Sequence, residues 1–375
     1  YFSNEPAEKL ASWLVDHAPA GTGAGSIMLL GSGSEAMEAA LKLARQYHLE
    51  NGEQDRSKVI ARKPSYHGNT LGALATGYHE GRRAPYAPLL RETHYIDVPY
   101  RYRMMREDET EAEFAARLAQ QLEDKIEELG AQNVMAFVLE PVVGATLGCV
   151  TSPKAYFKTI REVCDKHGVL LIADEVMCGM GRTGTTYALE QEGITADITT
   201  LAKGLGAGYQ PIAAVLTAKK IMSVISQGSG KLWNGHTYMS HAVAAAAALA
   251  VQEYIESENL HDNIRVRGRQ LEGCLQSAFS AHPHVGDIRG RGLFWSIELV
   301  EDKASKKPYA ATDQIAIKIG AAALENGMMC YPTQGCANGI DGDHVLLAPS
   351  YTSSAEEITT IVDLLERAVS VVVGD

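Results

Sequence analysis

Apolar positions follow two patterns along the middle of the chain, continuous runs and helical spacing. Residues 134–139 and 169–173 are continuous apolar runs, the pattern of strands buried on both faces, and 198–202 is a shorter, threonine-rich run. Between the first two runs, residues 153–167 carry the helical spacing of apolar positions. This order of strand, helix and strand predicts βαβ units, and therefore an α/β fold with a mostly parallel central sheet flanked by helices.

The two ends of the chain are organised differently. From residue 285 onward, a glycine-punctuated strand and two helical stretches predict a smaller α+β C-terminal domain. We therefore expect an N-terminal segment over 1–20, a large domain over 21–260 and a small domain over 261–375. The opening YFSNEPAEKL lacks the pattern of a signal peptide and reads as the middle of a fold, so we also expect residues upstream of it.

Three predicted strands each end in a charged residue: Glu140, Asp174 and Lys203. Ligands of open parallel sheets bind at the carboxyl ends of the strands, so these side chains stand where a ligand would be held. A lysine after an apolar strand is partly desolvated, which lowers the pKa of its amine and makes it a nucleophile. An imine-forming lysine and an acid that pairs with a ring nitrogen together suit pyridoxal phosphate. A structural ion pair between strand ends is the alternative, and Glu140 is either a support for Asp174 or an acid bonded to backbone.

Two further segments suit such a ligand. Small residues in GSGSEA, residues 31–36, precede a predicted amphipathic helix, and backbone N–H groups at a helix N-terminus attract anions. Gly33 and Ser34 are therefore candidates for binding a phosphate group, with an ordinary serine cap as the alternative. Tyr66 and His67 follow another short strand, where an aromatic ring can stack on a flat heterocycle or be buried in the core.

Composition narrows the class of protein. The chain has 375 residues, of which 46% are hydrophobic and 21% charged, as in globular proteins with a large core. A formal net charge of -12 argues against nucleic acid or an anionic membrane as the main partner, and no apolar run approaches membrane-spanning length. The six cysteines form no CxxC pair, so we expect no disulfide framework, no metal site and a reducing, cytoplasmic location.

Seven motifs stand in a fixed order along nearly the whole chain. They are GSGSEA at 31–36, YHG at 66–68, EPVVGATLG at 140–148, LIADEVMCGMGRTG at 171–184, TLAKGLGAGYQP at 200–211, HTYMSH at 236–241 and RGRGLFWSIEL at 289–299. Each is weak alone, but in this order they resemble the class III (omega-amino acid) pyridoxal-phosphate-dependent aminotransferases of fold type I. The resemblance implies a fold type I transferase with pyridoxal 5'-phosphate as its cofactor.

The resemblance also implies a role for each candidate residue. Lys203 would form the Schiff base and carry the proton of the 1,3-shift, and Asp174 would pair with the pyridine nitrogen. The other implied roles are ring contacts from Val176 and Tyr66 on opposite faces, phosphate binding by Gly33, Ser34 and Thr237, support from Glu140, and a place near the substrate for His67. Because Thr237 would act across a subunit interface, the resemblance implies a homodimer with shared active sites.

The chain departs from this family pattern on the substrate side. Leu346 stands where many members carry an arginine two residues before Ala-Pro, and Tyr331 stands where biotin-pathway relatives carry one before a proline. Ala145 and Met177 replace a glutamate and a glutamine found in relatives. A bidentate arginine is the usual way to hold a carboxylate, so its absence weakens the case for a common α-amino acid donor. The arginines to test as substitutes are Arg82, Arg83, Arg289 and Arg291.

These observations predict an aminotransferase that moves an amino group from a primary amine or omega-amino compound to a 2-oxo acid such as pyruvate, through Lys203. A lyase, racemase or aminomutase on the same fold is the alternative, because such enzymes share Lys203 and Asp174, and fold alone does not fix the reaction. Only the aminotransferase requires a carbonyl acceptor. The intact Lys203 and Asp174 argue against a third possibility, a binding protein without catalysis.

Overall fold

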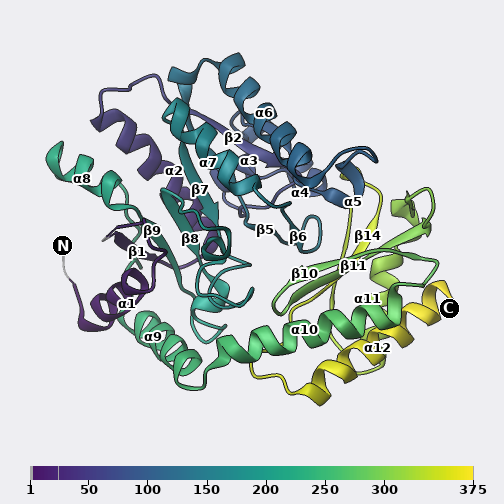
Figure 1. The fold of residues 1–375 in the computed structure, drawn as a ribbon. Helices are drawn as coiled ribbons and strands as arrows, with labels where there is room; N and C mark the ends of the chain where they lie inside the picture. The colour runs from purple at the N-terminus through teal and green to yellow at the C-terminus, as the bar shows by residue number, and fades with distance from the viewer. Residues whose placement is uncertain (1–2, 24, 375) are drawn as a thin grey trace.

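A seven-stranded sheet forms the centre of the larger part of the chain (Figure 1), in the order β1-β9-β8-β7-β4-β2-β3. The computed structural model describes residues 3–23 and 25–374, so positions 1–2 and 24 near the predicted N-terminal segment, and 375, lie outside it. The strands are β1 (Ser26–Leu30), β2 (Lys58–Lys63), β3 (His94–Asp97), β4 (Val134–Leu139), β7 (Leu170–Asp174), β8 (Ile198–Leu201) and β9 (Ala213–Thr217). The β2–β3, β2–β4, β4–β7 and β7–β8 pairs are parallel, and β9 is antiparallel to both of its neighbours. The prediction of a mostly parallel sheet is confirmed.

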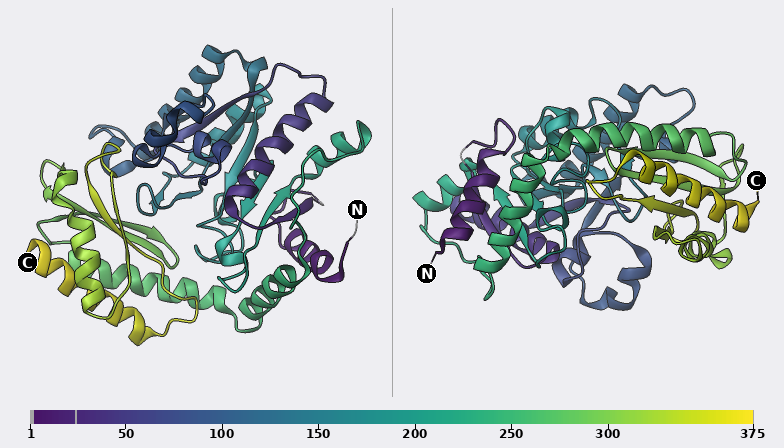
Figure 2. Two further views of the ribbon diagram at one scale, coloured as in Figure 1. Left: turned by 180° about the vertical axis from the view of Figure 1, so that it is seen from behind. Right: turned by 90° about the horizontal axis from the view of Figure 1, so that it is seen from below.

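Helices cover both faces of this sheet (Figure 2), which explains the continuous apolar runs. On β7, Leu170 and Ile172 face the core under α2 (Gly33–Glu50) and α8 (Lys219–Gln227), whereas Leu171 and Ala173 face the core under α6 (Glu111–Leu129) and α7 (Tyr156–His167). The same opposite face, over β1 and β9, also carries α1 (Glu5–Asp16) and α9 (Ala242–Ser257). A strand between two helical layers has no solvent face, so every residue of β7 is buried.

A second, antiparallel sheet follows in the last third of the chain, as the α+β prediction requires. It contains β10 (Val285–Arg291), β11 (Phe294–Asp302), β14 (Asp343–Leu347) and β13 (Tyr331–Gln334), and the short β12 (Lys307–Pro308) pairs with β11. A core of its own packs it against α10 (Leu260–Phe279), α11 (Ile315–Glu325) and α12 (Ala355–Val373). Figure 1 shows α9 and α10 running one after the other from the first sheet toward the second.

Short elements connect these layers. They are α3 (Leu71–Thr76), α4 (Glu80–Arg83), α5 (Arg101–Met104), β5 (Val142–Val143) and β6 (Val150–Thr151). Within the described residues, every helix is too short or too polar to cross a lipid bilayer.

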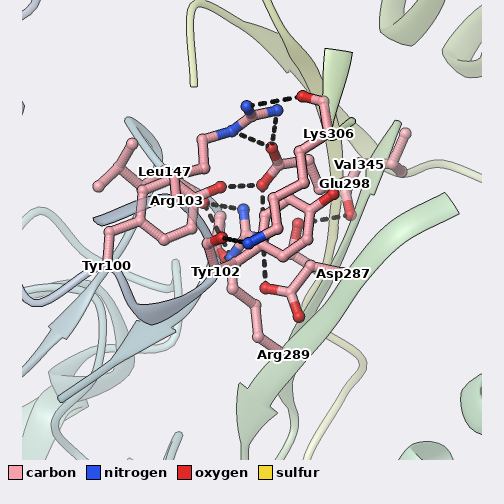
Figure 3. A network of polar contacts seen from close by, with 11 residues as sticks. Tyr100, Tyr102, Arg103, Leu147, Asp287, Arg289, Glu298, Lys306 and Val345 are labelled. Atoms are coloured by element: carbon pink, nitrogen blue, oxygen red, sulfur yellow. Dashed lines mark hydrogen bonds and ion pairs between the residues drawn. The ribbon is translucent and has the colours of Figure 1, made fainter. Parts of the chain in front are cut away.

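One buried glutamate joins the two sheets (Figure 3). Glu298, on β11, is fully buried, and its carboxylate accepts hydrogen bonds from the Tyr100 hydroxyl, from Arg103 Nε at 2.6 Å and from Arg289 Nη1 at 2.7 Å. Arg289 also donates to the carbonyl oxygen of Leu147, in the loop between β5 and β6. Two arginine charges compensate the cost of burying the acid. The network therefore fastens the second sheet to the loop that follows β4.

Candidate functional site

The carboxyl ends of three neighbouring parallel strands form the candidate site. Asp174 is the last residue of β7, Lys203 lies two residues after β8, and Glu140 directly follows β4. All three line one cavity of about 310 Å³. Strand ends of a parallel sheet meet at one edge, which is why three residues far apart in sequence come together here. The structure thus brings Asp174 and Lys203 together at this cavity, as the strand-end rule predicts.

Hydrogen-bond donors hold the Asp174 carboxylate on its buried side. His67 Nδ1 lies 2.8 Å from Oδ2, the Thr200 hydroxyl donates to Oδ1 at 3.2 Å, and the backbone N–H of Val176 donates to Oδ1 at 3.0 Å. None of these donors is an arginine or a lysine, so within residues 3–23 and 25–374 this buried acid has no permanent cation among its bonded partners. His67 lines the same cavity, and its imidazole contacts Asp174 itself.

Lys203 has a strained backbone conformation and a largely buried amine. Its backbone φ is 40°, in the left-handed region that side-chain-bearing residues rarely adopt and that clusters at functional sites. Burial lowers the pKa of its amine, against the raising effect of Asp174 and Glu140. An amine with a lowered pKa is uncharged more often at neutral pH, which is the form that attacks a carbonyl.

The N-terminus of α2 lies at the same cavity. Ser32 caps the helix by accepting the Glu35 backbone N–H, and Gly33 and Ser34 line the cavity. A methyl group added to Gly33 would come within 3.0 and 3.1 Å of two methyl carbons of Val176, so a larger residue here would have to displace Val176 by a few tenths of an ångström. The first N–H groups of a helix have no partner within the helix, which suits an anion at this position.

Glu140 and the aromatic residue of the YHG motif complete the wall. The Glu140 carboxylate accepts the backbone N–H of Tyr66 at 3.2 Å and that of Gly144 at 2.9 Å, and burial raises its pKa. It therefore fixes the backbone that carries Tyr66, which lines the cavity together with His67 and Val176. Glu140 thus acts on backbone groups and does not bond Asp174 directly.

The structure separates one predicted residue from the rest. Thr237 is exposed in the loop between α8 and α9 and does not line the Lys203 cavity of the described chain. Sequence reasoning, in turn, missed Thr200, which bonds Asp174 from the adjacent strand. Its position at the end of a threonine-rich strand was the available signal, because a polar side chain in an otherwise buried strand needs a partner.

The two positions expected to carry a carboxylate-binding arginine do not face the cavity. Leu346 and Tyr331 are cross-strand partners on β14 and β13, and neither lines the Lys203 cavity. Leu346 is buried in a small apolar cluster that packs against Met177, which does line the cavity. Leu346 and Tyr331 therefore leave the cavity without a clamp from these two positions.

Comparisons with known proteins agree with this geometry. The family model for class III aminotransferases matches residues 1–369. The chain is 43% identical to an aminotransferase of Gibberella zeae over 381 aligned positions, covering 100% of this chain and 74% of that protein. It is 45% identical to an uncharacterised aminotransferase of Schizosaccharomyces pombe, covering 98% and 80%. The omega transaminase of Pseudomonas jessenii in complex with PMP superposes with a TM-score of 0.91 at 34% identity, covering 99% and 80%.

These similarities and the site define a transferase of fold type I. The chain belongs to the class III aminotransferase family, and it is an aminotransferase. The proteins reported above are named as aminotransferases or transaminases, so they give no support to a lyase, racemase or aminomutase.

Proposed function

We propose that the chain uses pyridoxal 5'-phosphate, held at the Lys203 cavity, to move an amino group from a primary amine or omega-amino compound to a 2-oxo acid such as pyruvate. The observation that carries this proposal is the convergence of Lys203, Asp174 and the α2 N-terminus on one cavity. The close backbone approach at Gly33 and the lack of a bonded cation at Asp174 fit a ligand with a phosphate and a protonated ring nitrogen. When bound, the cofactor supplies a carbonyl group for the amine and a ring that accepts electrons.

Lys203 would serve first as an attachment point and then as a base. Its Nζ would hold the cofactor covalently until the substrate amine replaces it. Because burial lowers the pKa of this amine, the released Nζ would take a proton from the substrate carbon that bears the amino nitrogen and return it across that nitrogen, to the cofactor carbon that Nζ had held before. The left-handed backbone conformation of Lys203, with φ at 40°, sets the direction in which its side chain leaves the chain.

The other residues would position and polarise. Asp174 would pair with the ring nitrogen and keep it protonated, while His67, Thr200 and the Val176 N–H hold the carboxylate in place. Tyr66 and Val176 would contact the two ring faces, and Glu140 would hold the backbone of Tyr66. Gly33 and Ser34 would bind the phosphate group at the helix N-terminus.

A second copy of the chain would complete the site. We infer a homodimer in which Thr237 of the partner subunit binds the phosphate, because Thr237 is exposed here and does not reach its own cavity. Large aromatic side chains in the same loop support an interface, since Trp233 and Tyr238 are 73% and 77% exposed. Light scattering coupled to gel filtration would return the mass of two chains.

Two further inferences concern the cellular compartment and the domain boundaries. The six cysteines are all unpaired, which supports a reducing compartment such as the cytoplasm. The separate apolar cores of the two sheets support a large domain over 21–260 and a small domain over 261–375.

The deciding experiment is a half-reaction screen. Holoenzyme is mixed with a panel of amines and amino acids without an acceptor, and the absorbance of the cofactor is followed. We expect conversion with omega-amines, recovery on adding pyruvate, and a borohydride-reduced label on Lys203. A Lys203→Ala variant should keep the fold but lose both the label and turnover. Labelling of another residue, or normal turnover in Lys203→Ala, contradicts the proposal.

A further inference from the structure

Arg62 is a buried arginine to which no acid is bonded. It lies next to the last residue of β2 and is completely shielded from solvent. Within residues 3–23 and 25–374 it forms no ion pair, and its Nε and Nη1 atoms have no hydrogen-bond partner. Burial raises the pKa of the neighbouring Tyr156 hydroxyl, which therefore stays neutral. A buried charge is costly unless a partner compensates it, so the position of Arg62 calls for an explanation.

The Nη2 atom of Arg62 binds the wall of the Lys203 cavity from behind. It donates a hydrogen bond to the backbone carbonyl oxygen of Glu140, the residue that directly follows β4. The parallel pairing of β2 with β4 ends one residue earlier on β2, at Ala61 and Val138. Beyond this pair, the Arg62 side chain holds the Glu140 backbone, and the Glu140 carboxylate holds the backbone N–H of Tyr66. The two side chains thus join the segments where the hydrogen bonds of the sheet have ended.

The backbone between Arg62 and Tyr66 is fixed as well. The Ser65 hydroxyl donates to the carbonyl oxygen of Arg62 at 2.6 Å. A closed circuit therefore runs from Arg62 through Glu140 to Tyr66 and back along the chain. Arg62 itself lines neither the Lys203 cavity nor a second cavity of about 420 Å³ beside the following residue, Lys63. It reaches the site only through Glu140.

The charge of Arg62 matters for Glu140 because of the groups around that carboxylate. The groups whose charges interact with it are His67, Asp174, Arg62, Lys203 and Cys178. Burial raises the pKa of the Glu140 carboxyl, the charge of Asp174 raises it further, and the charge of Arg62 opposes this rise. Burial also raises the pKa of the Cys178 thiol, which stays neutral. An imidazole and an amine can lose their charge near neutral pH when they are buried, whereas a guanidinium cannot.

We propose that Arg62 is a positioning residue of the aminotransferase: its buried charge keeps the Glu140 carboxylate ionised, and this carboxylate fixes the backbone that carries Tyr66. The inference rests on the proposed function, to which it adds a residue outside the cavity. An ionised Glu140 accepts the backbone N–H groups of Tyr66 and Gly144 with its two oxygens. A protonated carboxyl carries a hydroxyl on one oxygen and has less acceptor capacity, so one of these segments would lose its hold.

The test follows the release of pyridoxal 5'-phosphate from the holoenzyme. The cofactor retained after timed gel filtration into cofactor-free buffer gives a release rate constant at pH 6.0 and at pH 8.5. Each constant is divided by the wild-type value at the same pH, so that titration of the cofactor cancels. For Arg62→Gln we expect a ratio of about 10 at pH 6.0, as for loss of one hydrogen bond to a charged group, and below about 3 at pH 8.5, where Glu140 is ionised without help.

Three further variants separate charge from packing. Arg62→Lys keeps the charge but not the planar fork, and its ratio should stay below about 3 at both pH values. Glu140→Gln imitates the protonated acid, so it should give about 10 at both pH values, alone or combined with Arg62→Gln. Arg56→Gln is the matched control, because Arg56 is another buried arginine, lies before the opposite end of β2 and is paired with Glu53. Its ratio should be the same at both pH values.

A ratio for Arg62→Gln that is equal at both pH values would assign the residue to packing alone and overturn the proposal. So would a pH-dependent ratio that persists in the double variant, or an Arg62→Lys variant that behaves like Arg62→Gln. If Arg62→Gln does not fold, Arg62→Lys and Glu140→Gln decide, and any result other than the two ratios given for them contradicts the proposal. Absence of a borohydride-reduced label on Lys203 in the wild-type holoenzyme would instead count against the proposed function.

Discussion

Two buried acids of this chain, Asp174 and Glu298, have surroundings of opposite kind. Glu298 accepts hydrogen bonds from two arginines and a tyrosine, and none of the cavities described above contains it. Asp174 is held by an imidazole, a hydroxyl and a backbone N–H, and it faces the cavity of Lys203. Burying a carboxylate is costly unless its charge is compensated. The chain bonds its own cations to Glu298, whereas among the described residues no arginine or lysine bonds Asp174, which shares an open cavity with Lys203.

This contrast separates a structural acid from a functional one better than burial does. Both residues are buried, so exposure alone would rank them together. The difference lies in whether the bonded partners carry positive charge and whether open space lies beside the carboxylate. An acid with bonded donors, no bonded cation and a cavity beside it is a candidate binding group for a cationic ligand atom.

The largest expected effect is on turnover at Asp174. Asp174→Asn keeps an acceptor oxygen for Thr200 and the Val176 N–H but removes the negative charge. We expect turnover of the holoenzyme to fall by on the order of 10²- to 10³-fold, because the charge would no longer hold a proton on the ring nitrogen. The thermal midpoint of the variant should stay near that of the wild type. Unchanged turnover with a bound cofactor would mean that Asp174 is structural, as Glu298 is.

The next effect is on stability at Glu298. Glu298→Gln leaves the buried Arg289 and the half-buried Arg103 facing a neutral group, so we expect the free energy of unfolding to fall by about 3–5 kcal/mol. Urea denaturation of the cofactor-free protein measures this change. Glu301→Gln is the control on the same strand, because Glu301 forms an exposed ion pair with Lys307 worth at most about 1 kcal/mol. Equal stability of the two variants would erase the distinction drawn between the acids.

The two acids also differ in how far sequence could predict them. Asp174 and Lys203 follow apolar runs, a local pattern, and the rule for strand ends places them together. The partners of Glu298 cannot be predicted in this way, because Tyr100 lies 198 positions away and β11 is apolar on both sides of the glutamate. His67 and Asp174 lie 107 positions apart in sequence. The order of the motifs therefore predicted that His67 belongs to the site, but it did not predict the contact of His67 with Asp174.

The direction of individual side chains was the second feature that the sequence could not predict. The family pattern drew attention to Leu346 as a missing clamp, yet on β14 this residue belongs to a buried apolar cluster against which Met177 packs. The sequence position of Arg82, within a polar arginine-rich stretch, matched a solvated surface equally well. Its contact with Tyr66 depends on the Ser65–Tyr78 bridge, a tertiary feature without a local signature.

Glu175 is a further buried acid, and it extends the comparison to the pH dependence of stability. Glu175 follows Asp174, and within the described residues its carboxylate accepts hydrogen bonds from the backbone N–H groups of Ala188 and Leu189 alone. Burial raises its pKa to about 7. Because the folded state then binds a proton that the unfolded state releases above pH 4.5, stability is greatest at low pH and declines as pH rises toward 7.

Glu175→Gln should remove this decline. Between pH 5.5 and pH 8, we expect the wild type to lose about 2 kcal/mol more of its unfolding free energy than Glu175→Gln does, as measured by urea denaturation at both pH values. Other groups titrate in both proteins and cancel in the difference. A glutamine presents one acceptor oxygen, so the variant should be less stable than the wild type at pH 5.5 and close that gap at pH 8. Parallel pH curves would show that Glu175 stays charged, and backbone N–H groups alone would then suffice to compensate a buried carboxylate.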